Sequence, residues 1–182
     1  MRVVEVIFIV GWASFWLYWI AAAFSMKRGR VSWSREFRIR AVIIAIAIVL
    51  VRLGVFRGHG ITTDPLRTGI GLGLFAVGLC FAIWARLYIG RNWGTPMTQK
   101  LDPELVTNGP YRFVRHPIYS GILIAGVGTT VALNWSWLAA FALAGIYFIY
   151  SAIIEERYLA ELFPSDYPAY KRTTKMLVPF IF

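Results

Sequence analysis

The sequence predicts an all-α, polytopic membrane protein with about five transmembrane helices. Of its 182 residues, 58% are hydrophobic and only 15% are charged, whereas a soluble domain carries about 25% charged residues. The mean hydropathy is +0.61, and long apolar runs alternate with short basic segments. This pattern is typical of one compact bundle of membrane-spanning helices and argues against an ordinary soluble domain.

The distribution of charge points to a membrane surface as the partner of the basic residues. The formal net charge is +10, from 19 Lys and Arg against 9 Asp and Glu. The basic residues gather in short loops, most densely in KRGRVSWSREFRIR at 27–40. The positive-inside rule and contact with anionic lipid account for them, so we expect no nucleic-acid partner. With Cys80 as the single cysteine and only two histidines, we expect neither a disulfide nor a metal site.

Three spans are predicted in the first half of the chain. The first runs from Val3 to Phe24 with Glu5 as its one charge, and it lacks a cleavage site of the signal-peptide kind. The second runs from Ile39 to about Phe56, and the third from Gly69 to about Tyr88. Small residues let membrane helices approach closely. We therefore expect close packing at the glycines of the third span: Gly69, Gly71, Gly73 and Gly78.

The second half predicts a helical hairpin. No charged residue occurs from Pro117 to Ile154, a run that would measure about 57 Å as one helix, which is too long for one span. Asn134-Trp135-Ser136 is its only polar break, and we interpret this sequon as a turn between spans four and five. Glu155-Glu156-Arg157 is expected to end span five, before an amphipathic tail. Five spans place the N-terminus outside, the C-terminus in the cytoplasm and the basic loops on the cytoplasmic side.

A polar segment between apolar regions is the candidate functional site. It is Leu105–Gly121, LVTNGPYRFVRHPIYSG. Arg115-His116 opens span four and Glu155-Glu156 closes span five, so an antiparallel hairpin would bring these ionisable groups together. Pro117 suits the first turn of a helix, whose free N–H groups favour an anion. The apolar walls of the hairpin indicate a lipid-like partner, and the charged groups at its mouth indicate a zwitterionic partner. A purely structural role for His116 is the alternative.

Four short motifs carry a resemblance to a known family. They are Gly-x-Tyr, Arg-His-Pro-x-Tyr-x-Gly, Glu-Glu and a Phe-x-x-x-Tyr-x-x-Tyr tail, all within 86–182. This half of the chain resembles the isoprenylcysteine carboxyl methyltransferases as a short prokaryotic-type member, and is more distantly similar to phospholipid N-methyltransferases. The resemblance implies a catalytic region at 86–182, with 1–85 as an N-terminal anchor of three spans and a basic loop.

The resemblance also implies S-adenosyl-L-methionine as the methyl donor. It assigns catalytic roles to Arg115, His116 and Glu155. A carboxylate such as Glu155 can pair with the donor's ammonium group or ribose hydroxyls, and tyrosine rings can stack on adenine or face the sulfonium. Arg115 and helix-start N–H groups can receive the donor's carboxylate. The implied cofactor-binding residues are Gln99, Pro103, Glu104, Leu105, Val106, Tyr111, His116, Pro117, Ile118, Tyr119, Glu155 and Glu156.

The acceptor is less determined than the donor. The resemblance favours carboxyl O-methylation of an isoprenylcysteine-like, hydrophobic molecule at a prokaryotic inner membrane. N-methylation of a phospholipid amine, S-methylation of a small thiol and a non-catalytic lipid-binding protein are alternatives. Prenylcysteine-specific members carry an arginine one helical turn before the acidic pair, where this chain has Ser151. A carboxylate acceptor needs no general base, whereas a thiol or amine would make His116 or a glutamate the candidate base.

Overall fold

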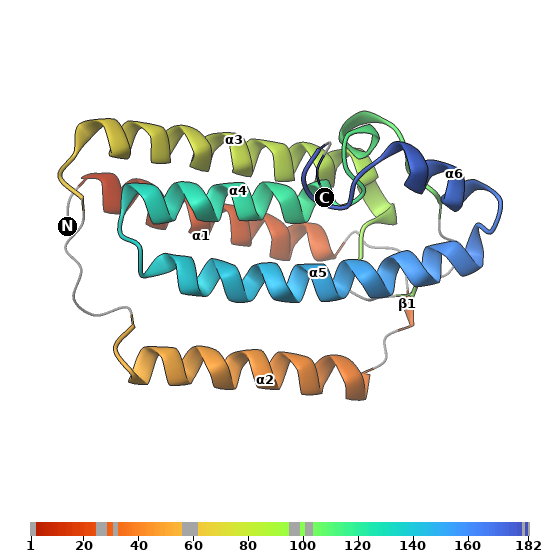
Figure 1. Ribbon diagram of the computed structural model, residues 1–182, viewed down its shortest axis with the longest axis horizontal. Helices are drawn as coiled ribbons and strands as arrows, with labels where there is room; N and C mark the ends of the chain where they lie inside the picture. The colour runs from red at the N-terminus through yellow and green to blue at the C-terminus, as the bar shows by residue number, and fades with distance from the viewer. Residues whose placement is uncertain are drawn as a thin grey trace.

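The computed structural model describes residues 3–24, 29–30, 33–55, 62–94, 99–100, 104–179 and 181, and in these residues the fold is helical, as predicted. The five long helices lie alongside one another, and the short helix near the C-terminus lies at one end of them (Figure 1). One two-residue pairing joins β1 (Gly29–Arg30) to β2 (Gln99–Lys100), antiparallel. The helices are α1 (Val3–Ala23), α2 (Trp33–Arg52), α3 (Pro65–Ile89), α4 (Pro117–Ala132), α5 (Trp137–Leu162) and α6 (Asp166–Thr173), with 3₁₀ turns η1 (Gly90–Asn92) and η2 (Gly109–Arg112).

Three described segments are long and apolar enough to cross a bilayer. They are Val3–Ala23, Pro65–Asn92 and Trp137–Leu162. Two shorter apolar helical stretches, Ala41–Arg52 and Pro117–Ala132, complete the apolar set in the described residues. The chain is therefore an integral membrane protein by the length and composition of its helices. The count of five spans stays a prediction.

Several helix boundaries differ from the sequence-based expectation. The second helix runs from Trp33 to Arg52 instead of from Ile39 to about Phe56. The third helix begins at Pro65 instead of Gly69, because Asp64 caps it: the Oδ1 atom of Asp64 accepts a hydrogen bond from Leu66 N at 2.9 Å. At the other end of the chain, Glu155-Glu156-Arg157 ends the apolar run but not the helix, which continues to Leu162. Glutamate and arginine are good helix formers, so a change in polarity there does not interrupt the backbone pattern.

The backbones of α3 and α4 approach each other closely. A β-carbon placed on Gly71 would lie 2.6 Å from Gly128 O, and one placed on Gly121 would lie 2.6 Å from Gly78 O. The two backbones therefore touch, which only glycine permits at these points. The close-packing prediction is correct for Gly71 and Gly78. It is wrong for Gly69 and Gly73, where an added β-carbon would meet no heavy atom of a neighbouring element within 4 Å.

The helix α1 contributes to the core beneath the site. Phe8, Phe15 and Trp19 are buried, and the Trp19 ring meets the Trp93 ring edge-on at 5.8 Å between centroids. The indole of Trp12 donates a hydrogen bond to Thr129 Oγ1 on α4 at 3.1 Å. These contacts tie the first helix to α4 and to the region that follows α3.

A short turn reverses the chain between α4 and α5. Ser136 N donates to the side-chain Oδ1 of Asn134 at 2.9 Å, an Asx turn that agrees with the interpretation of Asn134-Trp135-Ser136 as a turn. The reversal carries α5 back past the level at which α4 begins, and the end of α5 lies near α6 (Figure 1). The charged residues that flank the two helices therefore share one end of the molecule.

Candidate active site

The turn that precedes α4 is shaped by a glycine and a proline. Gly109 has a φ of 58°, a conformation that favours glycine over residues with a side chain. A β-carbon at Gly109 would also lie 2.5 Å from the Tyr88 ring. The 3₁₀ turn η2 begins at this glycine and buries Tyr111, which explains the Gly-x-Tyr motif in physical terms.

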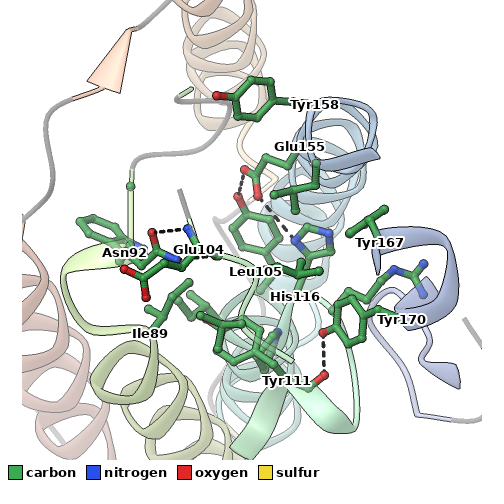
Figure 2. A pocket seen from close by; sticks show the side chains of 18 residues that line it. Ile89, Asn92, Glu104, Leu105, Tyr111, His116, Glu155, Tyr158, Tyr167 and Tyr170 are labelled. Atoms are coloured by element: carbon green, nitrogen blue, oxygen red, sulfur yellow. Dashed lines mark hydrogen bonds and ion pairs between the residues drawn. The ribbon is translucent and has the colours of Figure 1, made fainter. Parts of the chain in front are cut away.

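The structure brings His116 and both carboxylates of the acidic pair together. His116 Nδ1 lies 3.6 Å from Glu155 Oε2, and His116 Nε2 lies 3.5 Å from Glu156 Oε1. The Tyr119 hydroxyl donates to Glu155 Oε1 at 2.7 Å. The Tyr119 ring is stacked between His116 and Phe148, at 5.5 and 4.5 Å between centroids. Figure 2 shows the imidazole pointing toward the Glu155 carboxylate.

Arg115 and Glu156 form a buried ion pair next to His116. Arg115 Nε donates to Glu156 Oε1 at 2.6 Å, and Lys171 Nζ lies 2.7 Å from Glu156 Oε2. Another guanidinium nitrogen of Arg115 donates to the backbone carbonyl of Thr174. The side chain of Glu156 is 4% exposed and that of Arg115 is 8% exposed. The guanidinium that was expected to receive a donor carboxylate is thus engaged by Glu156 and Thr174.

A cavity lies next to these groups. Its volume, counted as the space that the centres of water molecules can occupy, is about 140 Å³. Its walls come from the end of α3, the segment before α4, the start of α4, the end of α5 and α6 (Figure 2). Ten of the predicted site residues line it: Glu104, Leu105, Val106, Tyr111, Arg115, His116, Pro117, Ile118, Tyr119 and Glu155.

Three predicted site residues are not among those lining the cavity. Glu156 lies next to His116. The backbone of Gln99 belongs to β2, but its side chain is not described, and Pro103 lies outside the described residues. For Gln99 and Pro103 the assignment to the cofactor site stays a prediction.

The cavity also has walls that the sequence did not reveal. From α3, η1 and the residues after them come Ile89, Asn92, Trp93 and Gly94, and from α5 and α6 come Tyr158, Leu159, Tyr167 and Tyr170. The two α6 tyrosines belong to the Phe-x-x-x-Tyr-x-x-Tyr motif, so a signal for them was present. No such signal marked the residues that follow α3.

Asn92 and Arg86 hold the wall that follows α3. The Asn92 side chain donates to Glu104 O at 2.6 Å and accepts from Glu104 N at 3.3 Å. Arg86 donates to Gly90 O and to Ala22 O, each at 2.8 Å. The Arg86 guanidinium carbon also lies 4.6 Å from the centre of the Trp93 ring. The amide of Asn92 therefore joins two chain segments that both line the cavity.

Tyr111, Tyr167 and Tyr170 are neutral groups. Burial raises the pKa of Tyr111 and of Tyr167 above the ordinary phenol value, with the nearby Tyr170 adding to the shift at Tyr111 and Glu156 adding to it at Tyr167. Burial likewise raises the pKa of Tyr170, whose hydroxyl donates to Tyr111 O at 2.6 Å. They supply aromatic faces and hydroxyl donors without adding negative charge to the site.

The fold and this arrangement define a polytopic helical protein with an acidic, aromatic-walled cavity at one end of its bundle. The family model described as "Phospholipid methyltransferase" matches residues 66–166. The chain belongs to this family. The resemblance to isoprenylcysteine carboxyl methyltransferases is consistent with this membership. The match begins in α3, and so it includes part of the region interpreted as an anchor.

The similar proteins include a metal-resistance protein and a methyltransferase. The chain is 32% identical to the cobalt-zinc-cadmium resistance protein CzcN of Cupriavidus metallidurans, over 76% of this chain and 61% of that protein. It is 42% identical to protein-S-isoprenylcysteine O-methyltransferase B of Arabidopsis thaliana, over 43% of this chain and 41% of that protein. The chain thus spans about two fifths to three fifths of these relatives.

A solved structure shares the fold. It is that of the eukaryotic intramembrane Ras methyltransferase ICMT (isoprenylcysteine carboxyl methyltransferase). The TM-score is 0.58 at 24% sequence identity, and the match covers 83% of this chain and 55% of that one. This likeness shows that the chain shares the helical fold of that protein over the matched part.

Proposed function

We propose that the protein transfers a methyl group from S-adenosyl-L-methionine to a hydrophobic acceptor held in the membrane. The observation that carries this proposal is the cavity at the mouth of α4 and α5, where Tyr119 and His116 flank the Glu155 carboxylate. It occurs in a chain of the phospholipid methyltransferase family. Neither the helix bundle nor the family alone would place the chemistry at this end of the molecule.

The chemistry of the cavity walls fits the proposed donor. S-adenosylmethionine carries an ammonium group, a carboxylate, a sulfonium cation and an adenine ring. Two carboxylates, Glu104 and Glu155, line the cavity and can face its cations. The faces of Trp93 and Tyr111 can accept the adenine or the sulfonium. The first bond of the α-helical kind in α4 runs from Ser120 N to His116 O, so the N–H groups before Ser120 in the first turn have no partner within the helix. They can donate to the carboxylate of the methyl donor.

The side chains around the cavity position and desolvate the reactants. When bound, the donor supplies a methyl group made electrophilic by its sulfonium. Tyr119 fixes the Glu155 carboxylate through the 2.7 Å hydrogen bond, and the aromatic walls exclude water. Orientation of this kind supplies much of the rate of a displacement that needs no covalent help from the protein. If the acceptor is a thiol or an amine, His116 is placed to take its proton and share it with Glu155 at 3.6 Å.

The membrane arrangement that we propose has five spans. It adds the shorter apolar stretches of α2 and α4 to the three long helices. The N-terminus is then outside the cell and the C-terminus is in the cytoplasm, with the site at the cytoplasmic face of a prokaryotic inner membrane. Arg115, Lys171 and Lys175 lie at that end of the bundle, and a water-soluble donor reaches it from the cytoplasm. In this arrangement, 1–85 is the anchor and 86–182 is the catalytic region.

A groove between α2 and α5 favours an acceptor with a long apolar chain. The α2 side of the groove consists of Arg38, Ile39, Val42, Ile43 and Ile46, and the α5 side consists of Leu143, Ile146, Tyr147 and Tyr150. Because helical side chains repeat every 3.6 residues, Tyr147 and Tyr150 share one face of α5 with Tyr158, which lines the cavity. Tyr158 lies about 12 Å beyond Tyr150 along the helix axis. An apolar chain in the groove would thus have its head near the cavity.

For this reason we propose carboxyl O-methylation of an isoprenylcysteine-like molecule as the specific reaction. N-methylation of a phospholipid amine is the second candidate, and the family description favours it. A small thiol would leave the groove unused. Ser151, one turn before Glu155, is fully buried and its hydroxyl has no hydrogen-bond partner among the described residues. The chain thus provides no cation at that point for an acceptor carboxylate.

An acceptor panel tests the proposal. Purified protein in lipid nanodiscs is incubated with methyl-labelled S-adenosylmethionine and, separately, N-acetyl-S-farnesylcysteine, phosphatidylethanolamine and a short-chain thiol. We expect base-labile label on the farnesylcysteine. Base-stable label on the phospholipid would support N-methylation, and label on the thiol alone would remove the membrane acceptor from the proposal. An absence of both label transfer and saturable donor binding would contradict the enzyme assignment and favour a lipid-binding role.

A further inference from the structure

The two adjacent glutamates of α5 differ in what they contact. Glu155 lines the cavity and its side chain is 27% exposed, whereas Glu156 is buried next to His116. Accepting the proposed function, we propose that Glu156 is a positioning residue that does not touch the methyl donor. It fastens the C-terminal segment, defined here as Asp166–Leu177, to the start of α4, and thereby keeps His116 and the α6 wall of the cavity in place.

The contacts of Glu156 join three parts of the chain. Its Oε1 accepts from Arg115 Nε at 2.6 Å and lies 3.5 Å from His116 Nε2, and its Oε2 lies 2.7 Å from Lys171 Nζ. Arg115 and His116 immediately precede α4, Lys171 belongs to α6, and Glu156 itself belongs to α5. A single buried carboxylate therefore links α4, α5 and α6 through cationic partners. A buried carboxylate needs such partners to offset its desolvation.

The C-terminal segment is hydrogen-bonded along the start of α4. Arg115 N donates to Lys175 O at 2.8 Å, and His116 N donates to Met176 O at 3.1 Å. One turn further on, the hydroxyl of Ser120 donates to Leu177 O at 2.6 Å. These bonds hold the backbone on both sides of His116, so detachment of the segment would release the imidazole from its position against Glu155.

The same segment supplies one wall of the cavity. Tyr167 is 2% exposed and lines the cavity together with Tyr170, whose hydroxyl donates to Tyr111 O. Arg115 reinforces the attachment, because its guanidinium bonds both Glu156 and the carbonyl of Thr174. Loss of the Glu156 charge would weaken the ion pairs with Arg115 and Lys171 together, and would loosen this wall as well as His116.

Proteolysis at Lys175 measures the attachment without using the methyl donor. The Lys175–Met176 bond lies within the segment that pairs with Arg115 and His116, so a protease can cleave it only after the segment has detached. The cleavage rate then follows the detached fraction when reattachment is fast. Full-length protein in nanodiscs is treated with endoproteinase Lys-C, and release of residues 176–182 is followed by mass spectrometry.

The variants separate the two glutamates. For Glu156→Gln we expect release to accelerate about ten- to hundredfold, the effect of losing a charge-assisted hydrogen bond. Glu155→Gln should release at the wild-type rate and lose donor affinity. The matched control is Glu161→Gln, an exposed residue on the same helix, and it should change neither quantity. Lys171→Met should accelerate release, and Lys171→Arg should restore the wild-type rate.

The outcomes distinguish this inference from the proposed function. Wild-type release from Glu156→Gln would overturn the positioning role, whatever its activity. Loss of donor affinity by Glu156→Gln with release unchanged would assign Glu156 to the donor site instead. If wild-type protein binds no donor while Glu156→Gln still accelerates release, the attachment stands and the proposed methyl transfer fails.

Discussion

Replacing Gly71 tests whether backbone contact between α3 and α4 sets the geometry of the bundle. In Gly71→Ala, the new β-carbon would meet Gly128 O at 2.6 Å and Ala132 N at 2.7 Å. Both atoms belong to the α4 backbone, so no rotamer change can relieve the overlap. Ordinary van der Waals contact begins near 3.4 Å, so the two helices must separate locally by about 0.8 Å. A gap of that size removes roughly a quarter to a half of the dispersion energy between the atoms that it separates.

We expect Gly71→Ala to lower the free energy of unfolding by about 1–3 kcal/mol, the range for overpacked cores. Gly73→Ala is the matched control on the same helix, because its β-carbon meets no heavy atom of a neighbouring element among the described residues within 4 Å. Alanine there should be neutral or stabilising by about 0.5–1 kcal/mol, through helix propensity. Unfolding in mixed micelles, followed by circular dichroism, measures both. Equal stability of the two variants would refute the packing account.

Three further predictions concern the site. Tyr119→Phe keeps the ring stack but removes the hydroxyl that donates to Glu155. Donor affinity, measured by calorimetry, should fall about tenfold, while the free energy of unfolding should change by less than about 1 kcal/mol. Unchanged affinity would argue against the role of this bond. Asn92→Ala breaks both hydrogen bonds to the Glu104 backbone and should lower the free energy of unfolding by about 1–3 kcal/mol. An unchanged thermal unfolding temperature would contradict this role of Asn92. Tyr170→Phe removes the hydrogen bond to Tyr111 O and should speed Lys-C release of residues 176–182, whereas an unchanged rate would show that this bond does not hold α6.

Helix identity and the placement of the ionisable cluster follow from residue patterns. The apolar run from Pro117 is too long for one span, and the polar break at Asn134 indicates where it reverses. That reversal alone brings His116 near Glu155, because consecutive antiparallel helices share their ends. Hydrophobic pattern and chain length therefore predicted that these groups lie at the same end of the molecule, but not the contacts between them.

The residues that follow α3 could not be predicted in the same way. Asn92 lines the cavity because its side chain bonds the backbone of Glu104, a contact that depends on how two loops meet. Such an amide has no characteristic spacing in the sequence. The two close-packed glycines of α3 likewise cannot be told from the other two without knowing which face of the helix turns toward α4.

The assignment of Glu156 shows the limit of arguing from charge alone. Neighbouring acids in a sequence invite a common role, and here helix geometry turns them about 100° apart. Glu155 faces the cavity, while Glu156 faces Arg115 and Lys171. The sequence also could not reveal that the C-terminal segment returns to bond the residues beside His116.

Binding of labelled S-adenosylmethionine to purified protein in nanodiscs tests the central claim most directly. Wild-type protein and Glu161→Gln should bind it saturably with equal affinity. Glu155→Gln removes the charge of the cavity-lining carboxylate, and should weaken binding by roughly tenfold or more, the effect of losing a charge-assisted contact. Absence of saturable binding to the wild type, or equal affinity of Glu155→Gln and Glu161→Gln, would contradict a donor site at the mouth of α4 and α5.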